Sequence, residues 1–128
     1  MKLLLDTHAL LWSLSDDARL GQAARGLIVD PANDVLVSMA SLWEIVIKAR
    51  IGKLEADFGD IDRALEAQGF ARLAIEPRHL DALGRLPAHH RDPFDHLLIA
   101  QAEVEQAVLM TEDRNVARYA VKTVGCSA

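Results

Sequence analysis

Short apolar runs alternate with helical patterns along this chain, and this alternation constrains the fold more than any other feature. The predicted strands are Lys2 to Leu5, Val35 to Val37, Phe70 to Ile75 and Val108 to Met110, with Val121 to Val124 as an edge strand. Strands that alternate with helices usually pair in parallel, and the helices then cover both faces of the sheet. We therefore predict an α/β, three-layer fold around a mainly parallel sheet of four to five strands.

Helices are predicted between these strands from apolar residues that recur with helical spacing. They are expected at Thr7 to Leu14, at Leu20 to Ile28 after a cap at Asp16 or Asp17, at Ala40 to Ile51, around Ile61 to Leu65, after Pro77, after Pro93, and at Arg114 to Tyr119. Residues Gly125 to Ala128 are expected to be frayed. A length of 128 residues suits a single domain spanning residues 1–128.

The composition is that of an ordinary globular protein, with 51% hydrophobic and 26% charged residues. The net charge of −5 argues against binding nucleic acid through bulk positive charge, although bound metal can neutralise a cluster of acids. Cys126 is the one cysteine, so a disulfide within the chain is excluded and a reducing cytoplasm is the expected compartment. No apolar run approaches the roughly 18 residues that a membrane span needs.

Four carboxylates are expected where helices begin: Asp6, Glu44, Asp95 and Asp113. Three of those helices directly follow a strand, and the carboxyl ends of parallel strands share one edge, where ligands bind. Clustered acids repel one another unless they hold a hard, oxygen-liganded cation such as Mg²⁺ or Mn²⁺. The pattern therefore indicates metal-dependent phosphoryl chemistry.

Each acid also has a purely structural interpretation. Asp6 and Asp113 can be helix N-caps, and Glu44 has the spacing of a capping box with Ser41. Asp95 is the exception, because Asp92 before Pro93 already supplies the cap of that helix. Asp95 therefore favours the functional interpretation of the set.

The stretch from 78 to 91 is the most basic part of the chain. Its candidate RNA contacts are Arg78, Arg85, His89, His90 and Arg91. The alternative is a solvated helix and loop. A histidine-rich zinc or iron site built from His89, His90, Asp92 and His96 is disfavoured beside so many carboxylates. Trp12 and Trp43 can stack on bases, but their helical spacing favours contact with the core or with a partner.

Four segments in this order resemble the PIN domains, and more closely the VapC-type toxins of bacterial type II toxin–antitoxin pairs. The segments are LLLDTHALLW, SLWEIVIKARIGKL, HHRDPFDHLLIAQA and VLMTEDRNVARY. Asp6, Glu44, Asp95 and Asp113 match the acidic positions of the family, and Thr7 and Thr111 match its hydroxyl positions. Glu112 has no matching role.

This resemblance implies a PIN-like fold, a Mg²⁺- or Mn²⁺-dependent ribonuclease that leaves a 5′-phosphate, a homodimer, and inhibition by a protein antitoxin. Asp6, Asp95 and Asp113 would bind the metal, with Glu44 as a ligand or as an orienting group. Two alternatives stay open at this point. One is a phosphatase with an aspartyl nucleophile, although His8 stands where such enzymes carry a second aspartate. The other is a PIN domain that binds RNA or protein without catalysis.

Overall fold

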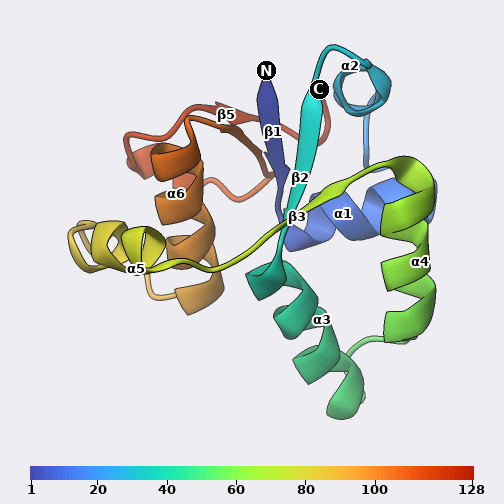
Figure 1. Cartoon of the computed structure of the whole chain (residues 1–128), viewed down its shortest axis with the longest axis horizontal. Coiled ribbons are helices and arrows are strands. Elements are labelled where there is room, and N and C mark those ends of the chain that lie inside the picture. Colours follow the sequence, from blue (N-terminus) through green and yellow to red (C-terminus); the bar gives the residue numbers. More distant parts are fainter.

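The computed structural model describes residues 1–128. Its elements, in chain order, are β1 (Lys2–Leu5), α1 (Thr7–Leu14), α2 (Gln22–Val29), β2 (Asp34–Ser38), α3 (Met39–Arg50), α4 (Phe58–Gln68), β3 (Ala71–Leu73), α5 (Pro77–Gly84), α6 (Pro93–Glu105), β4 (Val108–Met110), the 3₁₀ helix η1 (Val116–Arg118) and β5 (Thr123–Val124). Figure 1 shows the helices arranged on both sides of the central strands. No helix is both long and apolar enough to cross a membrane.

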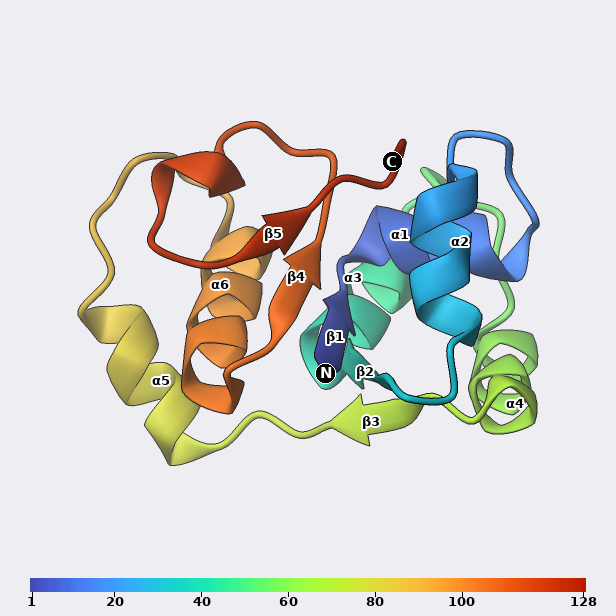
Figure 2. The same ribbon diagram turned by 90° about the horizontal axis from the view of Figure 1, so that it is seen from above.

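The five strands form one sheet in the order β3-β2-β1-β4-β5, and every neighbouring pair is parallel (Figure 2). In register, Leu4 of β1 lies opposite Leu36 of β2 on one side and Leu109 of β4 on the other. This topology confirms the predicted α/β fold with a parallel sheet. Because all strands run the same way, the chain leaves β1, β2 and β4 at one common edge.

Side chains alternate across β1, and the alternation divides the core into two layers. Leu3 and Leu5 are fully buried in the larger cluster, against residues of α1, α2, α3 and α4. Leu4 is buried in the smaller cluster, with Leu98 and Ile99 of α6. A strand that is apolar on both faces belongs in the centre of a three-layer fold, as its sequence predicts.

The end of the chain differs from the expected frayed segment. Cys126 is fully buried, and its carbonyl accepts a hydrogen bond of 2.8 Å from the Gly21 N–H. The Ala128 carbonyl accepts from the N–H groups of Ala23 and Ala24, which are unpaired donors at the start of α2. The C-terminal residues are therefore held in place by α2.

The predicted caps of two helices were wrong. Gly21 occupies the cap position of α2. Asp17 instead accepts hydrogen bonds from the backbone N–H and the guanidinium of Arg19. Helix α3 starts at Met39 with Ser38 as its cap, so Ser41 lies inside the helix. Glu44 consequently lies in the middle of α3 and has no capping role.

Three predicted elements are shorter than expected. The edge strand β5 covers Thr123–Val124 instead of Val121 to Val124. β3 covers only Ala71–Leu73, because the Phe70 N–H closes the end of α4 by donating to the Leu65 carbonyl. At the other end, the Ala74 carbonyl accepts from the buried Gln101 side chain. The predicted helix from Arg114 to Tyr119 is a single 3₁₀ turn.

Candidate active site

Asp6 leaves the carboxyl end of β1 and is the N-cap of α1. Its Oδ1 accepts from the Ala9 N–H at 2.7 Å, and the residue is 7% exposed. Burial raises the pKa of Asp6, and hydrogen bonds from Ala9 and from the Thr111 hydroxyl oppose that rise. Capping of α1 uses only Oδ1, so the capping and metal-binding interpretations of Asp6 are compatible.

Asp95 lies in the first turn of α6, beside Asp6. The cap of α6 is Asp92, which accepts from the N–H groups of Phe94 and Asp95 at 2.9 and 3.3 Å. The Asp95 carboxyl is therefore free for another role. Burial raises its pKa to about 8, with further contributions from a side-chain hydrogen bond with Asp113 and from the charges of Asp92, Asp113 and Asp6.

Asp113 lies in the loop after β4 and faces Asp95. Its Oδ1 accepts from the Asn115 N–H at 2.9 Å, and its own N–H donates to Thr111 Oγ1 at 3.1 Å. Burial alone would raise the pKa of Asp113, but the hydrogen bonds from Asn115 and from Asp95 outweigh it and lower that pKa. The two shifts run in opposite directions, so a proton shared by this pair is held by Asp95 and not by Asp113.

Glu44 is held by two other side chains, and its charge acts on Asp6. Thr7 Oγ1 donates to its Oε1 at 2.6 Å, and Lys48 Nζ lies 2.8 Å from its Oε2. Because both oxygens are occupied, this geometry suits an orienting group next to Asp6 better than a ligand.

Glu112 binds the end of the chain and not the acid cluster. It accepts from the Ser127 backbone N–H at 2.8 Å and from the Ser127 hydroxyl. These hydrogen bonds lower the pKa of Glu112. Its structural role is to hold the C-terminal segment against the sheet.

The five basic candidates separate into two groups. Arg78 pairs with Glu76 and Glu105, and Arg85 pairs with Asp81. Glu105 ends α6 ten residues after Asp95, a rise of about 15 Å along the helix, so the structure does not bring Arg78 to the acids.

His89, His90 and Arg91 form the second group, in the loop that leads into α6. The loop is attached to η1, because the Tyr119 hydroxyl accepts from the His89 N–H at 3.1 Å and Arg118 donates to the His89 carbonyl at 2.7 Å. His90 Nε2 lies 3.3 Å from Asp95 Oδ2. This loop therefore places His90 beside the acid cluster.

Two residues that adjoin the site were absent from the sequence-based set. Lys48 stands four residues after Glu44, a spacing at which opposite charges meet on one helix face, so the signal was present. The Tyr119 hydroxyl lies 2.9 Å from His90 Nδ1, although the two residues are 29 positions apart in the chain. No local sequence pattern indicates that contact.

The donor set suits a divalent cation. Ligand atoms of His90, Asp95 and Asp113 all lie within 4.8 Å of one another, and the Asp6 charge acts on Asp95 as well. Burial raises the pKa of Asp95 most, and the neighbouring carboxylates Asp92, Asp113 and Asp6 raise it further. Carboxylate oxygens prefer Mg²⁺ or Mn²⁺, so Asp6, Asp95 and Asp113 are the groups that would hold such an ion.

Comparison with known proteins agrees with this arrangement. A model of the PIN domain matches residues 3–122 of the chain. The chain belongs to the PIN domain family. The match spans Asp6, Glu44, Asp95 and Asp113, and it confirms the resemblance seen in the sequence. None of the curated proteins matches the sequence.

Solved structures share the fold of this PIN domain. VapBC2 from Rickettsia felis, bound to a DNA fragment from its promoter, contains a chain with a TM-score of 0.76, 14% identity and 98% of each chain covered. The DNA-bound VapBC from Salmonella typhimurium gives a TM-score of 0.73 at 14% identity, with 98% of each chain covered. VapBC-1 from nontypeable Haemophilus influenzae gives 0.68 at 17% identity over the whole of both chains. At these identities the likeness concerns the fold.

Proposed function

We propose that this PIN domain is a Mg²⁺- or Mn²⁺-dependent endoribonuclease and the toxin of a type II toxin–antitoxin pair. The observation that carries the proposal is the convergence of His90, Asp95 and Asp113, whose ligand atoms lie within 4.8 Å of one another, with the charge of Asp6 acting on Asp95 and the pKa of Asp95 raised to about 8. Groups that bind a substrate or a cofactor often have such shifted pKa values. Further support for the toxin assignment is that the similar folds come from VapBC proteins.

In the proposed reaction the acids hold the ion and the neighbouring groups hold the acids. When bound, Mg²⁺ or Mn²⁺ would lower the pKa of an attacking water and stabilise charge on the phosphate oxygens. Asp6, Asp95 and Asp113 supply the negative charge, Thr7 and Glu44 fix the start of α1 relative to α3, and Thr111 orients both Asp6 and Asp113. His89, His90 and Arg91 border the site where the RNA backbone would lie.

A cleavage assay tests the enzymatic part. Purified protein should cut single-stranded RNA in Mg²⁺ or Mn²⁺, and excess EDTA should stop the reaction. A single-stranded DNA of the same sequence serves as a control, since a water nucleophile does not need the 2′-OH and preference for RNA must come from binding. Persistent cleavage in EDTA would contradict metal dependence, and absence of cleavage under all conditions would favour a PIN domain that only binds.

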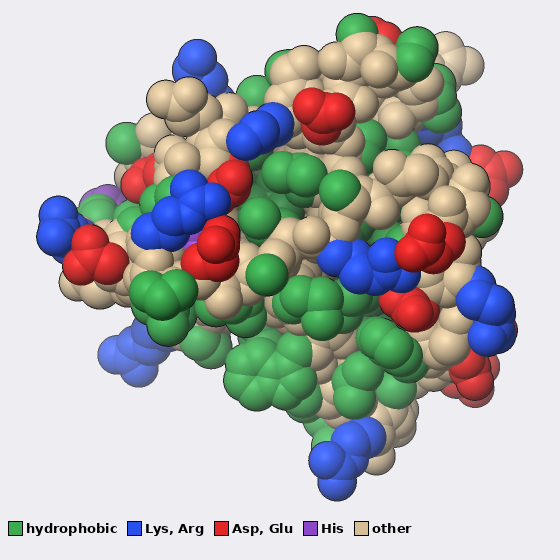
Figure 3. Space-filling model, viewed as in Figure 1, with side chains coloured by type: hydrophobic (Ala, Val, Ile, Leu, Met, Phe, Trp, Pro, Cys, Tyr) green, Lys and Arg blue, Asp and Glu red, His purple; other side chains and the backbone are tan.

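We further propose that the exposed face of α3 forms a homodimer interface. Met39, Trp43 and Ile51 lie along this face and are 40%, 59% and 60% exposed. Trp43 also packs edge-to-face on Phe94, with ring centroids 5.3 Å apart. Figure 3 shows hydrophobic side chains gathered where α3 lies in Figure 1, and a contiguous apolar patch of this kind commonly marks an interface.

An antitoxin segment is proposed to occupy a separate groove between α1 and the end of α3. Its volume is about 390 Å³, and its lining includes Thr7, Leu11, Trp12, Lys48 and Leu54. Three of its eleven lining residues are hydrophobic and most of the others are polar or charged, so it suits an amphipathic segment. Thr7 hydrogen-bonds Glu44 and is next to Asp6 in the chain, so the groove adjoins the acids. A basic antitoxin side chain in this groove could reach the acids and displace the ion. A short upstream reading frame whose DNA-binding product co-purifies with this chain and stops cleavage would support the assignment.

A further inference from the structure

His90 is directed at the acid cluster from the loop before α6. Its Nε2 lies 3.3 Å from Asp95 Oδ2, and its side chain is only 11% exposed. One ring nitrogen and one oxygen each from Asp95 and Asp113 fall within 4.8 Å of one another, a separation at which a single ion can bind all three groups. His90 thus takes part in the same constellation as two of the acids.

The other nitrogen of the ring is held in place by a buried phenol. His90 Nδ1 lies 2.9 Å from the Tyr119 hydroxyl, which also accepts from the His89 N–H. The ring packs edge-to-face on His96, with centroids 4.8 Å apart, and Tyr119 belongs to the core layer beneath. Metal-bound histidines usually donate their second ring N–H to an oxygen in this way, and the donation fixes the tautomer.

We propose that His90 is a nitrogen ligand of the divalent ion and that it makes the site prefer Mn²⁺ over Mg²⁺. This inference rests on the proposed function, because it concerns the ion that Asp6, Asp95 and Asp113 would hold. Mg²⁺ binds oxygen ligands and gives up water reluctantly, whereas imidazole favours first-row transition metals. An imidazole in an otherwise carboxylate site therefore changes the relative affinity for the two ions.

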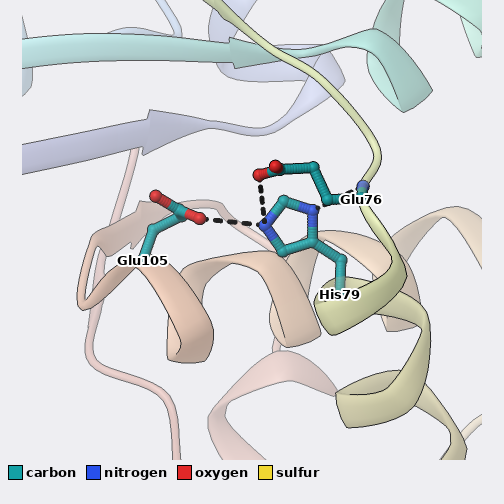
Figure 4. A group of neighbouring side chains, drawn as sticks. All are labelled: Glu76, His79 and Glu105. Atoms are coloured by element: carbon teal, nitrogen blue, oxygen red, sulfur yellow. Dashed lines mark hydrogen bonds and ion pairs between the residues drawn. The ribbon is translucent and has the colours of Figure 1, made fainter.

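The other histidine–carboxylate cluster of the protein does not have these properties (Figure 4). His79 Nδ1 accepts from the Glu76 N–H at 3.0 Å, so Nε2 carries the proton that reaches Glu105 at 2.9 Å. Arg78 and Lys2 already balance the charge of Glu105. Both ring nitrogens are satisfied without an ion, so this cluster is structural.

Electron spin-echo spectroscopy of bound Mn²⁺ tests the proposal, because a coordinated imidazole modulates the echo through its ¹⁴N nucleus. Wild-type protein should show this modulation, and His90→Gln should lose it. His89→Gln is the matched control and should keep it, because the His89 ring packs on Tyr119 at 4.9 Å and lies outside the three-residue group. The presence or absence of ¹⁴N modulation in the wild-type protein is informative by itself, so the proposal can still be tested if His90→Gln does not fold.

Calorimetric titrations with Mn²⁺ and with Mg²⁺ give a second readout. His90→Gln should weaken Mn²⁺ binding by about tenfold or more and change Mg²⁺ binding by no more than about twofold. Equal losses for both ions would show that His90 only positions Asp95 and would overturn the proposal. Bound Mn²⁺ without ¹⁴N modulation in the wild type would also overturn it while leaving the ion site intact. Absence of Mn²⁺ binding altogether would contradict the proposed function itself.

Discussion

Asp95 and Asp113 place carboxyl oxygens within 4.8 Å of each other, and their pKa values shift apart: that of Asp95 is raised to about 8 and that of Asp113 is lowered. Two like charges at that separation are unfavourable, so the pair retains a proton. Binding of a divalent cation would remove that proton. The pair therefore couples the charge state of the site to metal binding and to the stability of the fold.

Substitution of one acid should abolish cleavage without unfolding the chain. Asp6→Asn, Asp95→Asn or Asp113→Asn should lower the rate of metal-dependent RNA cleavage by roughly 100-fold or more, because each removes charge that holds the ion. Glu112→Gln is the matched control: Glu112 is adjacent to Asp113 in the chain but binds Ser127, so cleavage should stay close to wild type. Gel assays at several metal concentrations measure both. Wild-type rates in Asp95→Asn would refute the assignment.

The metal-free protein should become less stable as the pH rises toward 8. The folded-state pKa of Asp95 is about 8 against an ordinary value of 3.8, so the folded state binds more protons than the unfolded state between these values. This contribution is fully present below pH 4 and is lost as the pH passes through about 8. We expect at least about 1 kcal/mol of the free energy of unfolding to disappear over that interval. Urea titrations at several pH values in EDTA measure it, and Asp95→Asn should flatten the slope.

Saturating Mg²⁺ or Mn²⁺ should restore that lost stability. An ion that binds the folded chain and not the unfolded chain adds a free energy of RT ln(1 + [L]/Kd), or about 2.7 kcal/mol at 100 times Kd. The gain should be larger at pH 8 than at pH 5, where protons compete for the carboxylates. Unfolding midpoints at pH 8 that do not shift when either ion is added would argue against any functional metal site.

The proposed dimer interface on α3 can be tested by introducing one negative charge into it. Trp43→Asp places an acid in the centre of the exposed apolar face and should shift the mass in light scattering from dimer to monomer, since interface tryptophans often contribute about 2 kcal/mol or more. Val29→Asp is the control, because Val29 is 74% exposed on α2, outside this face. A dimer that persists in Trp43→Asp would place the interface elsewhere.

Substitution by alanine should change the stability of the fold in opposite directions at two glycines, one that caps α2 and one inside it. At Gly21 a Cβ would collide with the backbone of Ser127 and Ala128, so Gly21→Ala should destabilise the fold by about 1–3 kcal/mol. At Gly26 a Cβ meets nothing within 4 Å, so Gly26→Ala should stabilise α2 by about 0.5–1 kcal/mol.

The same pair of variants should differ in thiol chemistry. Burial raises the pKa of Cys126 to about 12, so the thiol should react slowly with a disulfide reagent in the wild type. Gly21→Ala should speed that reaction by displacing the C-terminal segment, while Gly26→Ala should not. Equal reactivity in both variants would mean that the segment is not held by α2.

Local patterns were sufficient for much of the fold and for the local position of Asp95 beside its helix cap. The apolar residues of β1 are buried on both faces, as a central strand of a parallel sheet requires. Asp92 before Pro93 is the cap of α6, which leaves Asp95 free, as the spacing predicted. Such features depend on neighbours within a few residues, so their physical causes are present in the sequence itself.

The tertiary structure decided which of the remaining side chains share a space. Arg78 pairs with Glu105 at the far end of α6, His90 meets Tyr119, and the last residues dock on α2 at Gly21. These partners are separated by 27 residues (Arg78 to Glu105) to 105 residues (Gly21 to Cys126) in the chain. Charge and hydropathy show that each residue needs a partner, but only the packing of helices on both faces of the sheet determines which partner is within reach.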